Sequence, residues 1–372
     1  MNDEQLSVVA LNTVADLSPK KIISLIEYFG SATNVLSVDK GELISSFNIA
    51  GKTAETIKNL SDFKTATEEL ELATKNNIKV LTYLDEDYPS QLKNICDFPP
   101  VLYIKGNFSK DDICSVSIVG SRRPTNYGRI VTENFCKYFA QKSITTISGL
   151  ASGIDTQVHT STFKNSGKTV AVIGNGLLEY YPAENRKLQN EIFEKGAVIS
   201  EFSLKRKALP INFPRRNRIV AALSQATIVI EAAIKSGSLI TAELACEYGK
   251  DVFAVPGPIF AKYSQGPNNL IKQGAFVAVT PEDVTEQVPF LADWVRKNTK
   301  KKKKEIEKDL PLISQSSKNI LKMIQSSITG ISLDEISLKA GVNVSEVSTI
   351  LLELELDGLI KAMPGQIYVR NT

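Results

Sequence analysis

The sequence predicts an α/β protein: a Rossmann-like, doubly wound parallel sheet with a small helical N-terminal domain and a C-terminal winged-helix domain. Two observations predict the sheet. Six short, β-branched apolar runs lie between residues 115 and 257, and helix-length segments separate them. Strands that are apolar on both faces require helices on both sides of a parallel sheet. The chain has 372 residues, enough for about two or three domains.

Residues 1–75 are predicted to form a small helical domain. Leu25, Ile26 and Phe29 share one helical face, and Gly30 and Gly51 mark turns between helices. The segments around these glycines distantly resemble helix-hairpin-helix or SAM-type units, whose turn amides can hold a phosphate. Residues 1–108 carry 10 basic and 15 acidic side chains, which favours packing or protein contact over phosphate binding.

Residues 76–288 are predicted to form an extended Rossmann-like domain. A weaker strand pair within 79–107 is expected to extend one edge of its sheet. The six main strands are expected at 115–120, 144–148, 169–174, 197–200, 227–232 and 251–257.

Residues 289–312 contain a run of lysines, Lys300 to Lys304, and are predicted to be a basic linker. Residues 313–372 show a helix, a turn, a second helix and two apolar strands around Pro364-Gly365, a pattern typical of a winged helix. Its second helix, 345–357, carries four acidic and no basic residues, so we expect this domain to contact protein or its own chain rather than DNA.

Composition excludes several classes of protein. The four cysteines form no CxxC pair and the single histidine has no cluster of ligands around it, so we expect neither a metal nor any other cofactor. An acidic N-terminus and the lack of a long apolar stretch predict a cytosolic protein with no membrane partner. The net charge is only +3, but residues 109–288 hold 21 basic against 16 acidic residues, which suggests an anionic partner.

The residues that follow the predicted strands indicate an anion site. Ligands of open parallel sheets bind beyond the carboxyl ends of the strands, where glycines allow close approach and helix amides favour an anion. At this edge we expect Gly120, Ser121, Arg122 and Arg123 after the first strand, Ser148 and Gly149 after the second, and Ser236, Gly237 and Ser238 at the start of a helix.

A second candidate segment combines an aromatic ring with arginines. Phe213 precedes a proline that begins a helix, and Arg215, Arg216, Asn217 and Arg218 follow. Single-stranded nucleic acid needs this combination, a platform for a base and cations for its phosphates. Residue chemistry alone equally allows the alternative, in which Phe213 belongs to the core and the arginines pair with Glu201 or Glu231.

Other activities have weaker support. No G-x-G-x-x-G follows the first strand, which disfavours a dinucleotide, and both Gly-Lys-Thr strings lack the first glycine of a P-loop. Ser148, Asp155 and His159 suggest a hydrolytic triad, but no G-x-S-x-G supports it. A Rossmann-type nucleotide-processing hydrolase is the alternative function, and a transcriptional regulator is a third.

Several motifs together resemble the DprA/Smf family of DNA-processing proteins. They are GSRRPTNYG at 120–128, SGLASGID at 148–155, FPRRNRIVAALS at 213–224, VIEAAIKSGSLITAELA at 229–245 and QGPNNLI at 265–271. The resemblance implies a non-enzymatic cytosolic protein that binds single-stranded DNA, forms a homodimer through its Rossmann-like domain and helps to load the RecA recombinase in natural transformation.

The resemblance also implies which residues contact DNA: Arg122, Ser148, Gly149, Phe213, Arg215, Asn217 and Arg218. Ser152 departs from the family pattern, because relatives usually have arginine there. This chain has therefore lost one positive charge near the expected pocket, and Arg123 is the residue that would compensate for it.

Overall fold

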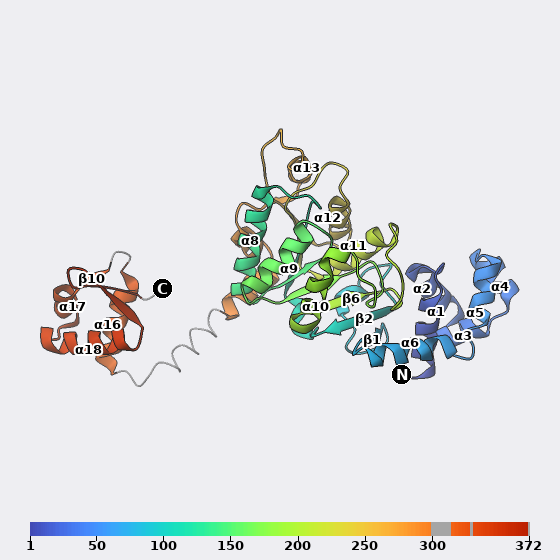
Figure 1. Ribbon diagram of the computed structural model, residues 1–372, viewed down its shortest axis with the longest axis horizontal. Coiled ribbons are helices and arrows are strands. Elements are labelled where there is room, and N and C mark those ends of the chain that lie inside the picture. Colours follow the sequence, from blue (N-terminus) through green and yellow to red (C-terminus); the bar gives the residue numbers. More distant parts are fainter. Residues whose placement is uncertain (299–313, 328–329, 371–372) are drawn as a thin grey trace. The chain divides into compact units, whose positions relative to one another are not determined.

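The computed structural model describes residues 1–298, 314–327 and 330–370, and it divides into two compact units, Met1–Lys297 and Asn298–Thr372 (Figure 1). The first unit holds the N-terminal helices and the large sheet. The second holds the winged helix. None of the described helices combines the length and the apolar character that a membrane span requires.

The N-terminal helices share a hydrophobic core with the sheet. Leu11, Leu25 and Ile57 from the helices belong to one buried cluster with Tyr103 and Val198 from the strands. Local sequence sets the helix ends, since the Ser18 side chain caps α2 and Gly30, with φ of 81°, ends it. The helices are α1 (Asp3–Thr13), α2 (Pro19–Phe29), α3 (Ala32–Ser37), α4 (Lys40–Phe47), α5 (Gly51–Lys58) and α6 (Lys64–Lys75).

The sheet has nine strands in the order β1-β2-β6-β5-β4-β3-β7-β8-β9. Strands β3 to β9 are parallel, and β2 joins them antiparallel to β6, with β1 antiparallel at the outer edge. The strands are β1 (Lys79–Thr82), β2 (Val101–Gly106), β3 (Ser115–Val119), β4 (Thr145–Ser148), β5 (Thr169–Val172), β6 (Ala197–Ser200), β7 (Ala226–Val229), β8 (Asp251–Ala254) and β9 (Phe276–Val277).

Helices cover both faces of the sheet, which confirms the predicted doubly wound fold. Phe135 and Phe139 of α8 (Asn126–Gln141) and Val158 of α9 (Ile154–Lys164) pack on one face. Val220 of α11 (Asn212–Leu223) and Ala242 of α12 (Gly237–Glu247) pack on the other. Further helices of this unit are α7 (Ser90–Lys93), η1 (Lys110–Ile113), η2 (Ala183–Asn185), α10 (Arg186–Lys195), α13 (Gln265–Lys272) and α14 (Pro281–Gln287).

The first unit extends beyond the boundary predicted at residue 288. Residues 289–298 are helical, Leu291 is buried and the Trp294 Nε1–H donates to the Lys142 carbonyl at 3.2 Å. Val288, Leu291 and Trp294 are spaced three apart, so one helical face carries apolar side chains onto the domain. The start of this segment is therefore not a linker, and its lysine run, Lys300 to Lys304, lies outside the described residues.

The second unit is a winged helix, as predicted. It comprises α16 (Gln315–Ser326), β10 (Ile331–Ser332), α17 (Leu333–Ala340), α18 (Val344–Leu356), β11 (Ile360–Met363) and β12 (Ile367–Arg370), and its strands form a sheet in the order β10-β12-β11. The hairpin turns at Pro364-Gly365, where Gly365 has a φ of 87° that favours glycine.

Candidate nucleic-acid interface

A cavity of about 530 Å³ lies at the carboxyl ends of β3, β4 and β7. The strand order reverses here, because β4 to β6 lie on one side of β3 and β7 to β9 lie on the other. This is the switch point at which open α/β sheets bind ligands. Ten of the predicted site residues line the cavity: Gly120, Ser121, Arg122, Gly149, Phe213, Arg216, Asn217, Ser236, Gly237 and Ser238.

Two aromatic rings and an arginine stand together on the wall of the cavity. The Phe213 ring, at the start of α11, lies 5.2 Å from the Tyr181 ring with 33° between their planes. The Arg122 guanidinium lies over the Phe213 ring at 5.7 Å from its centre. Phe213 is half-buried, whereas Arg122 and Tyr181 are exposed, Tyr181 by 43%. The ring is therefore a lining residue of the cavity and not part of the buried core.

Arg216 forms the floor of the cavity and is held by backbone carbonyls. Its Nη1–H groups donate to the carbonyls of Gly149 and Val172, at the ends of β4 and β5, and its Nε–H donates to Asn217 Oδ1 at 3.1 Å. Burial lowers the pKa of Arg216, and the nearby Asp155 carboxylate opposes that shift. An arginine stays protonated even when buried, so its positive charge stays beneath the cavity.

The opposite rim carries hydroxyls and the amino end of α12. Ser236 caps this helix, accepting from the Ser238 N–H at 3.4 Å, and its hydroxyl lies 2.7 Å from that of Ser238. Asn217 Nδ2 donates to the Gly237 carbonyl at 3.2 Å, which ties α11 to this rim. Free amides and the helix dipole favour an anion at such an end.

Four predicted site residues lie outside the cavity lining. Ser148 is buried, and its hydroxyl donates to the Ile118 carbonyl at 2.7 Å. Arg215 lies 5.3 Å over the Phe202 ring, on the side of the N-terminal helices. Arg123 is exposed but does not line the cavity. Arg218 is 3% exposed and takes part in a buried network.

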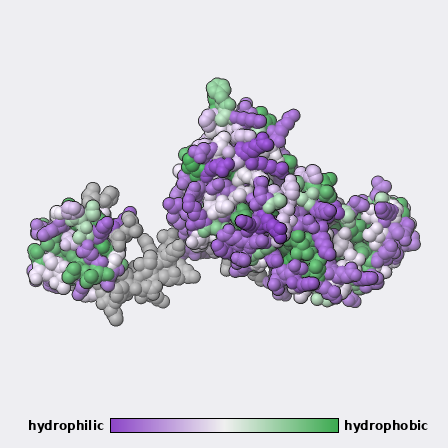
Figure 2. Space-filling model, viewed as in Figure 1, coloured by the Kyte–Doolittle hydropathy of each residue, from purple (hydrophilic) through white to green (hydrophobic). Residues whose placement is uncertain are grey.

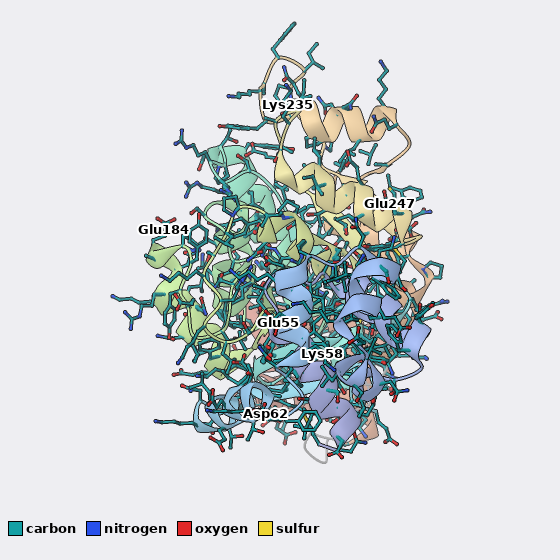
Figure 3. All side chains as sticks on the ribbon, turned by 90° about the vertical axis from the view of Figure 1, so that its right-hand side faces the viewer. Glu55, Lys58, Asp62, Glu184, Lys235 and Glu247 are labelled. Atoms are coloured by element: carbon teal, nitrogen blue, oxygen red, sulfur yellow. The ribbon has the colours of Figure 1, made fainter. Side chains whose placement is uncertain are left out.

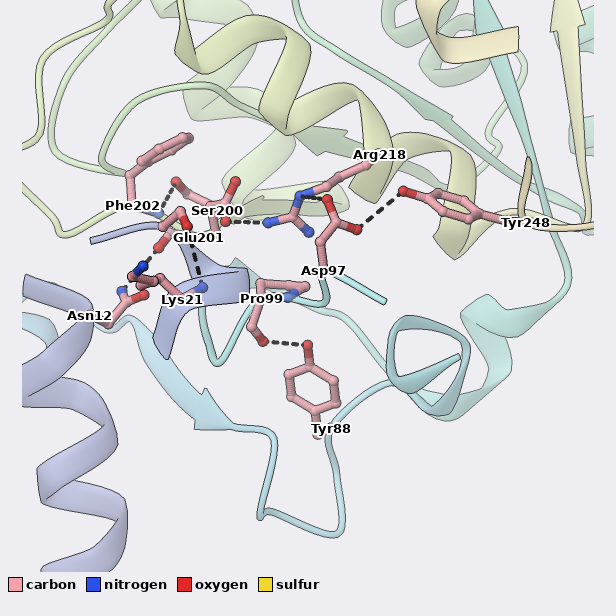
Figure 4. Close-up of polar contacts among 11 residues, drawn as sticks. Asn12, Lys21, Tyr88, Asp97, Pro99, Ser200, Glu201, Phe202, Arg218 and Tyr248 are labelled. Carbon is pink, nitrogen blue, oxygen red and sulfur yellow. Dashed lines mark hydrogen bonds and ion pairs between the residues drawn. The ribbon is translucent and has the colours of Figure 1, made fainter. Parts of the chain in front are cut away.

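Figure 4 shows this network beneath α11. The Arg218 guanidinium pairs with Glu201 and, through Nε at 3.3 Å, with Asp97, which also accepts from the Tyr248 hydroxyl at 3.3 Å. Asn12 of the first helix donates to the Glu201 carbonyl at 3.1 Å. Burial raises the pKa of Glu201 and the arginines oppose that rise. The sequence left open that the arginines pair with Glu201, and Arg218 is the arginine that does so.

Ser148 and His159 do not have the geometry of a hydrolytic triad. His159 is buried, and its Nδ1 lies 2.7 Å from Thr169 Oγ1, while within the described residues no hydrogen bond joins it to Ser148. Burial, together with the charge of Arg216, lowers the pKa of His159 to about 3. His159 is therefore a neutral residue that ties α9 to β5.

Two aromatic residues of the cavity lining were not among the site residues predicted from the sequence. Tyr181 and Tyr263 both line the cavity. Tyr181 stands directly before a proline, as Phe213 does, and that shared pattern of an aromatic residue before proline was the available signal. Ser152, the departure from the family pattern, donates to Glu184 at 2.5 Å on the exposed surface, where Figure 3 labels Glu184.

Comparisons with known proteins agree with this fold. The chain matches the family model of DNA recombination-mediator protein A over residues 79–289 and that of the DprA winged helix domain over residues 314–366. Protein Smf of Escherichia coli is 39% identical over 289 residues, which cover 77% of this chain and 75% of that protein.

Among the similar solved structures are two of DNA processing protein A. The X-ray structure of DNA processing protein A from Streptococcus pneumoniae has a TM-score of 0.67 and 34% identity, and the match covers 77% of this chain and 99% of that one. That of Helicobacter pylori DNA processing protein A, described for its single-stranded DNA binding mode, has a TM-score of 0.51 and 27% identity, with 59% and 96% covered. This chain thus belongs to the DprA/Smf family of DNA-processing proteins.

Proposed function

We propose that this protein binds single-stranded DNA in the cavity at the carboxyl edge of its sheet and acts in DNA processing during natural transformation. The observation that carries the proposal is the group formed by Phe213, Tyr181 and Arg122 on the cavity wall. Aromatic faces can stack on bases of any sequence, and an exposed arginine can neutralise a phosphate beside them. The single-stranded DNA binding described for the Helicobacter pylori relative supports the same assignment.

The proposed contact set is smaller than the sequence prediction. Arg122, Phe213, Asn217, Ser236 and Gly237 face the cavity and are half-buried or exposed. Arg218 is excluded from direct contact because its charge is buried against Glu201. Arg216 contributes positive potential from below and holds α11 in place.

We also propose that the protein acts without catalysis, in the cytoplasm, as a homodimer formed through the Rossmann-like domain, and that it helps to load RecA on incoming DNA. A nucleotide-processing hydrolase would need a positioned carboxylate pair or a free base. Glu201 is paired with Arg218, and Glu231 accepts the backbone N–H of Thr125 at 2.8 Å and its hydroxyl. Family membership supports the RecA role, and the neutral, enclosed His159 supports the absence of a general base.

The test is binding of single-stranded against double-stranded oligonucleotides of the same sequence across a salt series. We expect a strong preference for single strands, little sequence preference and an affinity that falls as salt rises, because phosphate contacts release counterions. Equal affinity for both forms at moderate salt would overturn the proposal. Adding RecA to the bound complex and following filament formation tests the loading role, and loss of labelled DNA or nucleotide would reveal catalysis.

A further inference from the structure

A loop beside the cavity carries the most exposed aromatic side chain of the described residues. Phe260 is 93% exposed and Ile259 is 73% exposed, in the segment between β8 and α13. Figure 1 draws this segment at the top of the first unit, and Figure 2 shows a hydrophobic tip there. Within the described residues, no aromatic ring or cation contacts the Phe260 ring.

The loop is continuous with the cavity. Tyr263 and Ser236 both line the cavity, and the Ala232 N–H donates to the Tyr263 carbonyl at 2.7 Å. This contact joins the loop before α12 to the loop before α13. Phe260 is three residues from Tyr263, so their Cα atoms are at most about 11 Å apart. A strand that occupies the cavity can reach Phe260 within a few nucleotides.

Hydrogen bonds hold the loop in one conformation. The Ala261 N–H donates to the Pro258 carbonyl at 2.9 Å, which places Phe260 at the third position of a β-turn. Asn268 pins the base of the loop, donating to the Gly257 carbonyl at 2.9 Å and accepting from the Gly257 N–H at 3.2 Å. A ring presented by an ordered turn loses less entropy on binding than one on a mobile loop.

Both loops are basic. Residues 252–281 contain Lys262 and Lys272 and no acidic residue, and residues 232–242 contain Lys235 and no acidic residue. Lys235 and Lys262 are exposed, and Figure 3 shows Lys235 near the top of the molecule. Positive charge around an exposed ring is complementary to a polyanion that offers aromatic bases.

We propose that Phe260 is a second base-stacking platform, and that Lys235 and Lys262 contact phosphates of the strand that occupies the cavity. This inference rests on the proposed function and extends the DNA path from Phe213 across the two loops. A second copy of this chain is a different possible occupant of the exposed tip, and the test includes it as an outcome.

The experiment measures dissociation constants of the full-length protein for oligo(dT) of increasing length. Phe260→Leu keeps an apolar side chain but removes the aromatic face, and Phe260→Trp restores one. Phe260→Leu should weaken binding of long oligonucleotides by about fivefold or more and leave the shortest bound oligonucleotide unaffected, and Phe260→Trp should bind like the wild type. Ile259→Ala is the matched control, because it shortens an exposed neighbour without an aromatic face. Because both side chains are exposed, unchanged circular dichroism is expected for all variants.

Three results would overturn the inference. The first is that Phe260→Leu leaves binding unchanged at every length while Arg122→Ala weakens it at every length. The proposed function would then stand, and the proposal of a second stacking platform would fail. Phe260→Leu and Ile259→Ala could weaken binding equally, which would show that apolar area matters and stacking does not. Both variants could lower the oligomeric state in sedimentation and leave binding unchanged, so that a second copy covers the tip. If the wild type binds no single strand, the proposed function itself fails.

Discussion

Replacing Phe213 and Arg122 separately distinguishes stacking from charge in the cavity. Phe213→Leu removes an aromatic face but keeps an apolar side chain of similar size. Arg122→Gln removes a charge but keeps a long polar side chain. Both changes act on one small group, because the Arg122 guanidinium lies 5.7 Å from the centre of the Phe213 ring.

The structure sets the expected magnitudes. Tyr181 already occupies one side of the Phe213 ring at 5.2 Å, so we expect this wall to stack on a single base. Loss of one stacked base costs about 1–3 kcal/mol, or roughly 5- to 150-fold in the dissociation constant. Arg122 is exposed and can neutralise one phosphate, so its loss should flatten the slope of log affinity against log salt by about 0.7.

Fluorescence anisotropy with a labelled oligonucleotide over a salt series gives both quantities. Phe213→Leu should lower affinity equally at every salt concentration, whereas Arg122→Gln should lower it most at low salt. Arg123→Gln is the matched control for charge, because Arg123 is exposed but does not line the cavity. Phe290→Leu is the control for the ring, since Phe290 is 42% exposed and lies elsewhere in the chain. The reasoning is refuted if Phe213→Leu lowers the melting temperature and leaves affinity intact, or if Arg123→Gln flattens the slope as much as Arg122→Gln does.

Three further predictions concern the architecture around the cavity. Arg218→Met should destabilise the fold by about 3–5 kcal/mol in urea unfolding, because it leaves Glu201 buried without its partner; Arg123→Met should change stability by less than about 0.5 kcal/mol, and equal effects would contradict the network. Burial lowers the pKa of His159 from its ordinary value of 6.5 to about 3, so the unfolded state takes up the proton first and stability falls as pH falls below about 6.5. His159→Asn, which keeps a polar side chain that can hydrogen-bond Thr169, should therefore lose about 2 kcal/mol less than the wild type between about pH 7 and pH 5; identical losses would contradict this. A protein ending at Lys297 should keep most of its affinity for single strands but show a flatter slope of log affinity against log salt, since Lys300 to Lys304 are removed. A protein ending at Gln287 should melt at a lower temperature, because it lacks the buried Leu291. A protein ending at Asp309 keeps Lys300 to Lys304 and lacks only the winged helix, so a loss of more than about 2 kcal/mol of binding in that protein would assign a DNA contact to the winged helix.

Periodicity in the sequence was sufficient to predict the sheet and its two helical layers. Each of the six apolar runs overlaps one of the strands β3 to β8, because continuous apolar runs between helices have few alternative folds. The two-residue strand β9 was not predicted. Phe276 and Val277 are both exposed at the edge of the sheet, so neither alternation nor burial marks them in the sequence.

The cavity was predicted from a rule of topology, but the direction of each arginine was not predictable. Arg216 and Arg218 are two residues apart on α11, and side chains at that spacing point to opposite sides of a helix. The Arg216 guanidinium donates to backbone carbonyls at the strand ends, and the Arg218 guanidinium pairs with Asp97 and Glu201. Asp97 lies more than a hundred residues earlier in the chain, so only the folded structure shows which arginine it neutralises.

Two glycines of the predicted site, Gly149 and Gly237, also differ in a way that the sequence does not show. Gly149 was expected to let DNA approach the backbone, but a Cβ atom there would collide with the Arg216 guanidinium. Glycine at this position therefore makes room for a charge of the protein itself, and that charge stays beneath the cavity with its geometry fixed before any ligand arrives. Gly237 differs, because no heavy atom lies within 4 Å of the position that its Cβ would take. Its backbone is exposed at the amino end of α12, so of these two glycines only Gly237 has the open space that the predicted contact with a phosphate requires.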